Sequence, residues 1–373
     1  MAKYEYLVAD FETGVVREEL PLSGVRWDRK LNMPGTFSGN LRYTHPKATR
    51  ANVDPGRTLL YVRRNGTVVW GGILWSVRKQ KGSDYVGLGA QEVWSYFERR
   101  RFNHSLAWIS QDNVDQMNIF RDMLRYVQGD QLQYDTLNYD YASKGAKYVD
   151  LQLDTTLSGV KREKRARSWE RKRVGTVARA LANLSDGFDF DIIVTEPTEH
   201  NFVHTLKLDY PNKGRRTNFV FEQGKNVDLF DWSLDAWELE NRVVVLGSGE
   251  GPETITAWNQ DTALLDAGYP LLDGMETRKD ITQKATAQKW ADKRLNERKL
   301  PTSIPLLQLR PTEEGEVGGF DLGDEVLVRA DDGFVSFDDY FRVLQYSVNV
   351  SNEGDEKMNI TVGESDRAKR SGI

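Results

Sequence analysis

The first hundred residues carry short apolar stretches separated by turn-forming residues, a pattern that predicts antiparallel β-structure. The clearest case covers residues 58–75, where two apolar stretches are joined by Asn65 and Gly66. Asn-Gly readily adopts the two positive φ angles of a type I′ turn, so this segment is predicted to be a β-hairpin. Gly71 and Gly72 inside its second strand indicate a bulge or a sharp bend of the kind found at barrel corners. A small closed barrel follows from this pattern.

Three later stretches place apolar side chains at helical spacing. The first starts at Asp112, a suitable N-cap, and ends at Gly129, where glycine can take the left-handed conformation of a helix C-terminus. The second covers residues 174–185, with Gly187 as its expected left-handed terminator. The third covers residues 282–298. Each is predicted to be an amphipathic helix that buries its apolar face.

Between the first two helices, residues 134–173 are polar and irregular, and only residues 148–153 alternate as a strand does. Strand patterns return after Phe188, whereas residues 252–280 are rich in loop-forming residues. The later predicted strands are residues 204–210, 219–222, 232–239, 242–246, 254–258, 344–350 and 358–362.

These patterns predict a mainly β fold with an α+β insertion, in which two β-barrel-like domains flank a mixed middle. The predicted units are an N-terminal β-barrel domain (1–100), a mixed α/β insertion domain (101–187), a β-rich domain (188–260) and a second β-barrel domain with one helix (261–373).

Composition narrows the chemistry that this chain can perform. Its 373 residues include no cysteine and four histidines, which excludes disulfides, thiol nucleophiles, iron–sulfur clusters and thiolate zinc sites. With 51 Lys and Arg against 56 Asp and Glu, the net charge is −5, so the whole chain lacks the basic excess of a dedicated nucleic-acid binder. No stretch approaches the roughly 18–20 apolar residues of a membrane span. The N-terminus carries acid where a signal peptide needs an apolar core, so Sec export is not expected.

Two motifs that resemble binding sites have simpler explanations. His200 and His204 have the spacing of a helical zinc pair, but they lie in a strand pattern. Four strand residues separate them by roughly 13–14 Å, which is too far to share a metal ion. The glycine-rich residues 247–251 follow a strand, as a phosphate-binding turn does, but a further strand follows instead of a helix. They are predicted to form a hairpin loop.

Pairs of acids are the remaining candidates for catalysis. Asp189 with Asp191, and Asp331 with Asp332, could act as the two carboxylates of a glycosidase. Such pairs occur by chance among 56 acidic residues, and solvation beside glycine or on an outward strand face explains both. No catalytic, cofactor-binding or metal-binding residue is therefore assigned, and no cofactor is expected.

Residues 161–173 form the one strong concentration of positive charge. A solvated loop, a docking surface for an acidic partner with Trp169 as its anchor, and a nucleic-acid contact are the alternatives. In an acidic chain, solvent or a protein partner is favoured over nucleic acid. Because like charges repel, the segment is expected to be mobile in the isolated chain. The candidate partner contacts are Arg162, Lys164, Arg165, Arg167, Trp169, Arg171 and Lys172.

Short motifs follow one another in a dense order through the N-terminal part of the chain. They lie at residues 6–10, 13–14, 19–25, 34–39, 45–46, 54–58 and 69–75, and include Pro34-Gly35-Thr36-Phe37-Ser38-Gly39 and Val69-Trp70-Gly71-Gly72-Ile73-Leu74-Trp75. This series resembles the opening of minor tail proteins from long-tailed phages of actinobacteria. Residues 171–190 resemble a helix-then-strand element of the same family, and together the motifs cover about a third of the chain.

The resemblance implies a hub protein of the tail tip or baseplate, similar to the hub of contractile-tail phages. Such hubs have two related β-barrel domains per subunit, and three subunits form a pseudo-sixfold ring that joins the sixfold tail tube to threefold tip parts. The implied partners are two further copies in a homotrimer, a distal tail protein, a tape measure protein and other minor tail or fibre proteins. Genomic DNA would pass through, which an acidic channel wall would favour by repelling phosphates. The implied location is the virion tail tip, after assembly in the host cytoplasm.

A glycan-binding or glycan-cleaving tail protein at the host surface is the main alternative. Trp70 and Trp75 are the aromatic residues that could stack on sugars, but both lie in a strand predicted to be mostly buried. A host enzyme of another fold is a second alternative, for which no catalytic residue can be named. The expectation is therefore a structural protein rather than an enzyme.

Overall fold

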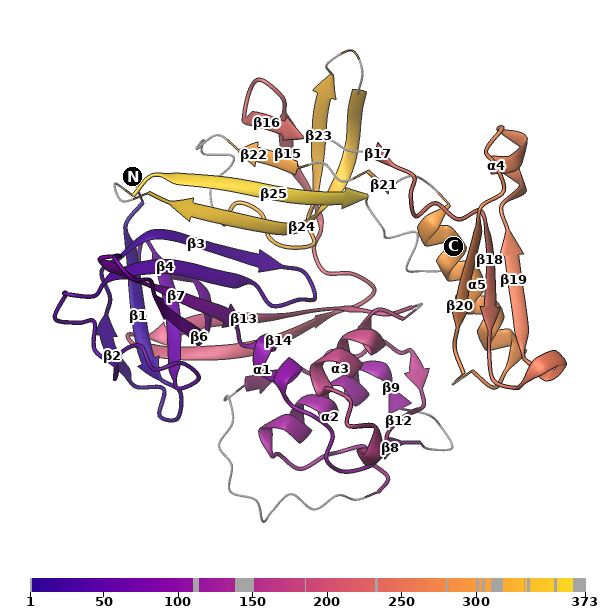
Figure 1. Cartoon of the computed structure of the whole chain (residues 1–373), viewed down its shortest axis with the longest axis horizontal. Helices are drawn as coiled ribbons and strands as arrows, with labels where there is room; N and C mark the ends of the chain where they lie inside the picture. Colours follow the sequence, from indigo (N-terminus) through magenta and orange to yellow (C-terminus); the bar gives the residue numbers. More distant parts are fainter. Residues whose placement is uncertain are drawn as a thin grey trace.

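A computed structural model describes most of the chain (Figure 1). The described residues are 2–109, 114–137, 151–184, 186–231, 234–279, 281–299, 302–303, 306–309, 318–331, 333, 336–351 and 354–364. Strands dominate, and a mixed α/β insertion separates the two strand-rich ends of the chain, so the predicted fold class is confirmed. Among the described helices, none is long and apolar enough to cross a membrane.

The N-terminal part is an antiparallel sheet with strand order β3-β4-β7-β6-β5-β1-β2. The sheet surrounds a core in which Trp27, Leu60 and Trp70 are fully buried. Its strands are β1 (Tyr4–Asp10), β2 (Val16–Glu19), β3 (Leu22–Lys30), β4 (Thr36–Arg42), β5 (Thr58–Arg64), β6 (Thr67–Lys79) and β7 (Tyr85–Glu92).

The β5–β6 hairpin confirms the prediction from Asn65 and Gly66, whose φ angles are 49° and 80°. The predicted bulge does not fall on Gly71 and Gly72, because both residues pair in regular register with β5. The register shifts of β6 lie on either side of them, at Val69 and at Trp75. Glycine is required there for close packing. A Cβ atom on Gly71 would lie 2.8 Å from the ring of Tyr61.

The C-terminal strands join the same sheet. Strand β24 pairs antiparallel with β3, with Val348 opposite Trp27, and one hydrophobic cluster contains both residues. The two ends of the chain therefore build a 13-stranded sheet with one continuous core. Its remaining strands are β15 (Arg216–Glu222), β16 (Val227–Asp231), β22 (Leu306–Leu309), β23 (Glu325–Asp331), β24 (Ser336–Val350) and β25 (Glu356–Glu364).

The insertion packs three helices and short strands around a second core, to which Leu7, Leu59 and Ile73 of the N-terminal sheet also contribute. Helix α2 begins after Asp115, whose carboxylate accepts a hydrogen bond from the Met117 N–H, rather than at Asp112, which lies outside the described residues. Gly129 has φ 77° and ends this helix as predicted. The elements are α1 (Trp94–Arg99), α2 (Gln116–Gln128), α3 (Val174–Ala182), β8 (Leu106–Trp108), β9 (Val114–Asp115), β10 (Leu151–Leu153), β11 (Lys161–Arg162), β12 (Lys164–Ala166) and a 3-10 turn (Ser168–Glu170).

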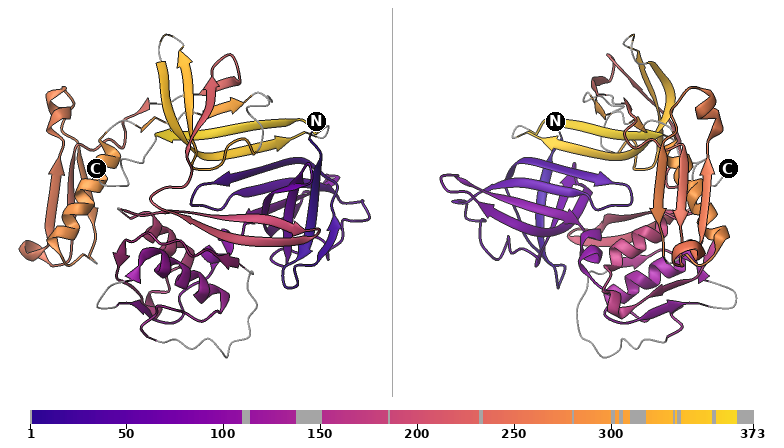
Figure 2. Two further views of the ribbon diagram at one scale, coloured as in Figure 1. Left: turned by 180° about the vertical axis from the view of Figure 1, so that it is seen from behind. Right: turned by 45° about the vertical axis from the view of Figure 1, so that its right-hand side comes forward.

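Helix α3 ends earlier than its pattern predicts, at Ala182. The left-handed residue after it is Asp186, with φ 54°, and not Gly187. Gly187 is instead needed for space, because a Cβ atom there would lie 1.9 Å from the carbonyl oxygen of Ala182. The chain then enters the long hairpin of β13 (Asp189–Thr198) and β14 (Asn201–Asp209), which runs between the N-terminal sheet and the insertion (Figures 1 and 2).

A small domain follows, with a three-stranded sheet of order β19-β18-β20 and helix α5 against one face. Ala287, Ala291 and Leu295 of α5 are buried there, which confirms the third predicted helix. The hairpin loop at residues 247–251 is also confirmed, as is the strand predicted at 254–258, which is β19. The rest of the predicted loop-rich region 252–280 contains a second strand and a short helix that were not predicted. The elements are β17 (Leu234–Asp235), β18 (Arg242–Leu246), a 3-10 turn (Gly251–Glu253), β19 (Thr256–Gln260), α4 (Thr262–Asp266), β20 (Asp273–Thr277), α5 (Lys284–Arg298) and β21 (Thr302–Ser303).

Candidate functional site

Asp189 and Asp191 at the start of β13 are buried, with exposed fractions of 0% and 7%. The prediction that they are solvated is therefore wrong. They belong to a charged junction at which β3, β7, β13, the connection after β14 and β24 meet. The side chains that cover them come from both ends of the chain, so no pattern within β13 could indicate their burial.

Asp191 is the centre of one half of this charged junction. Both of its carboxylate oxygens accept hydrogen bonds from Arg29 Nη2, at 2.7 and 2.8 Å, and one also accepts from Lys213 Nζ at 2.6 Å. Burial by itself raises the pKa of Asp191, but the positive charges of Arg29 and Lys213 outweigh it and hold the pKa below its usual value. Asp191 is therefore a buried, ionised acid that joins β13 to β3 and to the connection after β14.

Asp189 is the centre of the other half. Its carboxylate pairs with Arg342 of β24, which is 3% exposed, and accepts a hydrogen bond from Asn32 Nδ2 at 2.7 Å. The backbone N–H of Lys213 donates to it at 2.8 Å. Asn32 Oδ1 in turn accepts from the N–H of Phe190 at 2.8 Å. These contacts give the buried charge the hydrogen bonds that it needs to stay in the core.

Glu92 of β7 shares Arg29 with Asp191. Its carboxylate accepts hydrogen bonds from Arg29 Nε at 3.1 Å and from the Gly35 N–H at 2.7 Å. Burial raises the pKa of Glu92 to about 7, an effect that Arg29 opposes and that the negative charge of Asp191 reinforces. The junction therefore contains one carboxyl group that titrates near neutrality.

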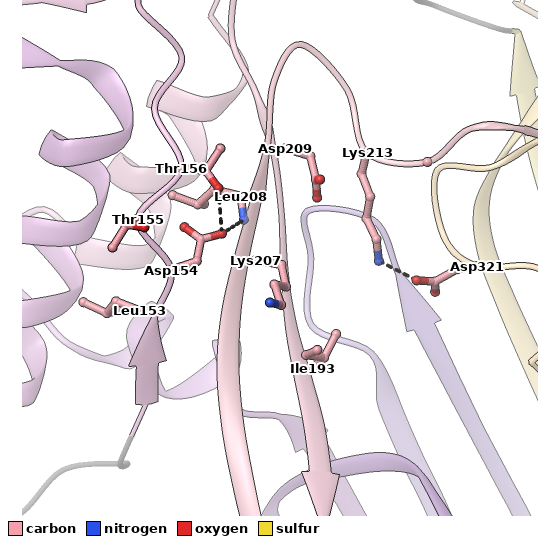
Figure 3. A pocket seen from close by; sticks show the side chains of 11 residues that line it. Leu153, Asp154, Thr155, Thr156, Ile193, Lys207, Leu208, Asp209, Lys213 and Asp321 are labelled. Atoms are coloured by element: carbon pink, nitrogen blue, oxygen red, sulfur yellow. Dashed lines mark hydrogen bonds and ion pairs between the residues drawn. The ribbon is translucent and has the colours of Figure 1, made fainter.

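A polar cavity of about 710 Å³ opens beside the charged junction (Figure 3). Lys213 reaches across its rim to Asp321, with the ion-pair atoms 2.9 Å apart, and Asp154 on another wall accepts a hydrogen bond from the Leu208 N–H at 2.8 Å. Burial raises the pKa of Asp209, which also lines the cavity. Of the charged groups that line the cavity, Lys213 and Asp321 are paired with each other, and within the described ranges no cluster of three acids or histidines could hold a metal ion. This arrangement fits a structural role, in which the charged groups connect separate segments of the fold.

The positive segment 161–173 is more ordered than its sequence indicates. Strand β11 pairs with β9, and strand β12 pairs with β8, so the prediction of an irregular stretch is wrong for these residues. Backbone pairing with β8 and β9 and the burial of Ala166 stabilise these strands, which their charged side chains by themselves could not do. Arg162 is half-buried, its Nε donates to Gln116 Oε1 at 2.7 Å, and burial lowers its pKa. Lys164 is also half-buried.

The other five candidate contacts are each exposed to solvent, and we call them the basic strip. Trp169 is 70% exposed, and the Arg167 guanidinium lies 5.6 Å from its ring centre. Lys172 pairs with Glu170 at 3.1 Å. The basic strip consists of Arg165, Arg167, Trp169, Arg171 and Lys172.

The two tryptophans considered for sugar stacking have structural contacts. Trp70 is 1% exposed, and its Nε1 donates to the carbonyl oxygen of Asp28 at 3.1 Å. Trp75 is half-buried, its Nε1 donates to Ser95 Oγ at 2.8 Å, and the Arg99 guanidinium lies 3.9 Å from its ring. Core packing and helix contacts therefore explain both residues.

The histidines do not form a pair. His200 lies in the turn between β13 and β14 with φ 63°. His204 is buried, with its Nε2 3.1 Å from the Tyr61 hydroxyl, and burial lowers its pKa to about 4. Of the second acid pair, Asp331 is exposed as predicted and Asp332 lies outside the described residues.

Arg29, Lys213 and Arg342 were missed by the sequence analysis. Arg29 and Lys213 lie in charge-rich stretches of the sequence beside other cations, Lys30 and Arg215, and no motif links them to Arg342. One local signal was present, because Arg342 falls between Phe341 and Val343 in a stretch that is otherwise apolar and aromatic. A charge inside such a stretch indicates a buried partner, although it cannot identify that partner as Asp189.

Comparisons with known proteins find similar folds among solved structures, but no match by sequence. No protein-family model matches the chain, and no curated protein matches it either. Two solved structures are similar over nearly their whole length: the 43 kDa tail protein of prophage MuSo2 from Shewanella oneidensis (TM-score 0.63, 11% identity) and the tail protein from Neisseria meningitidis MC58 (TM-score 0.62, 14% identity). Each match covers 98% of this chain and 99% of the other. Prophage tail protein gp18 from Listeria monocytogenes EGD-e is also similar, with a TM-score of 0.53, 10% identity and coverage of 96% and 94%. The chain therefore has the fold of these tail proteins.

Proposed function

We propose that this chain is a structural protein of a phage tail, located in the virion. The observation that carries the proposal is the similarity in fold to two tail proteins over 98% of this chain and 99% of each of theirs. The N-terminal motifs that resemble minor tail proteins of actinobacterial phages support the same class independently.

Within the tail, the chain is proposed to be a hub of the tip or baseplate. Three copies would form a ring, with the strand-rich regions of each copy in the ring wall, and the ring would join the sixfold tail tube to threefold tip parts. The distal tail protein, the tape measure protein and other minor tail or fibre proteins would be its neighbours, and the genome would pass through its channel. The continuous sheet supports this role, because a ring wall must transmit force between its two sides without a flexible joint.

The proposed role is not enzymatic. The buried acids at Asp189 and Asp191 are held by Arg342 and Arg29, so their charges stabilise the fold and are not available for proton transfer to a substrate. Incubation with host peptidoglycan and arabinogalactan is expected to release no fragments above a buffer control. Reproducible release that is abolished by changing one acidic residue would contradict this.

Imaging of the assembled tail tip tests the hub directly. Three copies are expected around the tail axis, with their strand-rich regions alternating in the ring wall. A single copy in the tip, or a ring of six identical copies, would rule out the hub while leaving a role elsewhere in the tail open. A strongly positive channel wall would contradict only the expectation that DNA slides past without binding.

A further inference from the structure

Two surfaces of opposite charge lie on opposite sides of the molecule (Figure 1). One is the basic strip on the insertion. The other is the turn of the β23–β24 hairpin, where residues 330–341 hold four aspartates and no lysine or arginine. We call Asp331, Asp338 and Asp339 the acidic hairpin, and all three are exposed.

The charges of the acidic hairpin are only partly neutralised within the chain. Asp338 pairs with Arg329 at 2.8 Å, in a contact where both side chains remain about half exposed or more. Asp331 and Asp339 accept hydrogen bonds from backbone N–H groups, those of Gly333 and Tyr340. Backbone donors leave the net negative charge in place, so the acidic hairpin presents unneutralised carboxylates to solvent.

The basic strip has the opposite imbalance, an excess of positive charge. Arg165 forms no recorded ion pair with any described residue, and Arg167 contacts the ring of Trp169 rather than an acid. Trp169 itself is 70% exposed, so its indole ring is accessible to a partner. Tryptophan and arginine are the residue types enriched at the centres of protein interfaces, and Arg167 and Trp169 provide both side by side.

The two surfaces cannot meet within one copy. The β23–β24 hairpin projects at one end of the molecule and the insertion forms the other end, in the view of Figure 1 and in both views of Figure 2. They can meet only between copies, as a head-to-tail contact. Contacts of this type repeat from copy to copy and close into a ring when the rotation permits.

We infer that the acidic hairpin of one copy docks on the basic strip of the next copy. This inference rests on the proposed homotrimer and identifies the contact that holds it together. Arg165 and Arg167 would lie against the exposed aspartates at the end of the hairpin, and Trp169 would be covered by the hairpin. Such a contact gains its specificity from complementary charge and weakens as salt screens it.

A charge-reversal experiment on the full chain tests the contact. The variants are Arg165→Glu with Arg167→Glu on the basic strip, Asp331→Arg with Asp339→Arg on the acidic hairpin, and all four changes together. Each reversal alone is expected to weaken trimer formation at least tenfold in sedimentation velocity, and the combined variant is expected to restore it. Lys81→Glu with Lys289→Glu, two exposed sites away from both surfaces, is the matched control and should leave the trimer unchanged.

Melting temperatures of all variants are expected to match the wild type, because every changed side chain is exposed. A trimer that persists in both single-surface variants would overturn this contact but leave the proposed ring intact. A wild-type chain that stays monomeric at all concentrations would overturn the ring and the contact together. If the trimer persists and the basic-strip variant instead loses affinity for duplex DNA, the strip is a nucleic-acid surface and the inference is wrong.

Discussion

The charged junction and the basic strip are both rich in charge, but they are built in opposite ways. In the charged junction, Asp189 and Arg342 are far apart in the sequence, buried, and paired. In the basic strip, Arg165 and Arg167 are near neighbours in the sequence, exposed, and alike in sign. Neighbours of one sign cannot neutralise each other, so they remain at the surface and are available to a partner. Single charges scattered among apolar strands can be buried only when the fold supplies a counter-charge, and their role is then structural.

The largest expected difference between the two regions is in stability. Arg342→Met would leave the buried carboxylate of Asp189 without its main counter-charge, and breaking a buried pair in this way costs about 3–5 kcal/mol. Arg329→Met is the matched control, since it breaks the exposed pair with Asp338 and should cost at most about 1 kcal/mol. Denaturant unfolding of both variants measures the difference. Equal losses of stability in the two variants would mean that the buried pair stabilises the fold no more than the exposed pair does.

The second prediction concerns pH and belongs to the charged junction alone. Because the pKa of Glu92 is raised from 4.5 to about 7, the folded chain binds more protons at this site than the unfolded chain between those values. The contribution of Glu92 to the free energy of unfolding therefore falls as pH rises from 4.5 to 7, by about 3 kcal/mol if the full shift is realised.

Asp191 acts in the opposite direction, because its lowered pKa gives stability that is lost only as the pH falls into the acid range. Glu92→Gln isolates the first effect. Urea unfolding between pH 4.5 and 7 should show a flatter pH dependence for the variant than for the wild type. An unchanged slope would show that Glu92 does not titrate in this range.

A small effect on stability is expected in the basic strip. Replacing Arg165, Arg167, Arg171 and Lys172 with serine removes exposed cations and should change the free energy of unfolding by only about 0.5 kcal/mol per site or less. Tail assembly should nevertheless be impaired, because the partner contact is lost. A large fall in melting temperature would show that these cations are paired inside the chain.

The smallest effect on folding is expected for Trp169→Ala. The side chain is 70% exposed, so its removal should leave the melting temperature unchanged within error. Trp108→Ala in the same domain is the contrast, because Trp108 is fully buried and its loss should cost about 3–5 kcal/mol. If Trp169→Ala also leaves trimer formation unchanged, Trp169 does not anchor the contact.

Elements stabilised by neighbours in sequence could be predicted well. The β5–β6 hairpin depends on Asn65 and Gly66, and helix α2 ends at Gly129, so the signals lie inside the elements themselves. Short strands that depend on distant partners were harder to predict. Strands β11 and β12 carry mostly charged side chains and form only because β9 and β8 offer backbone partners, which no periodicity within 161–166 could reveal.

By itself, the sequence determined the strand-rich character of the chain, its amphipathic helices and the position of the basic strip, because each depends on residues close together along the chain. Only the tertiary structure decided that β3 pairs with β24 and that Asp189 and Asp191 are buried. Burial of a charge depends on which counter-charge the fold brings within about 3 Å, and Arg29, Lys213 and Arg342 reach these acids from three separate parts of the chain. The same acids would be solvated surface groups if those strands did not meet.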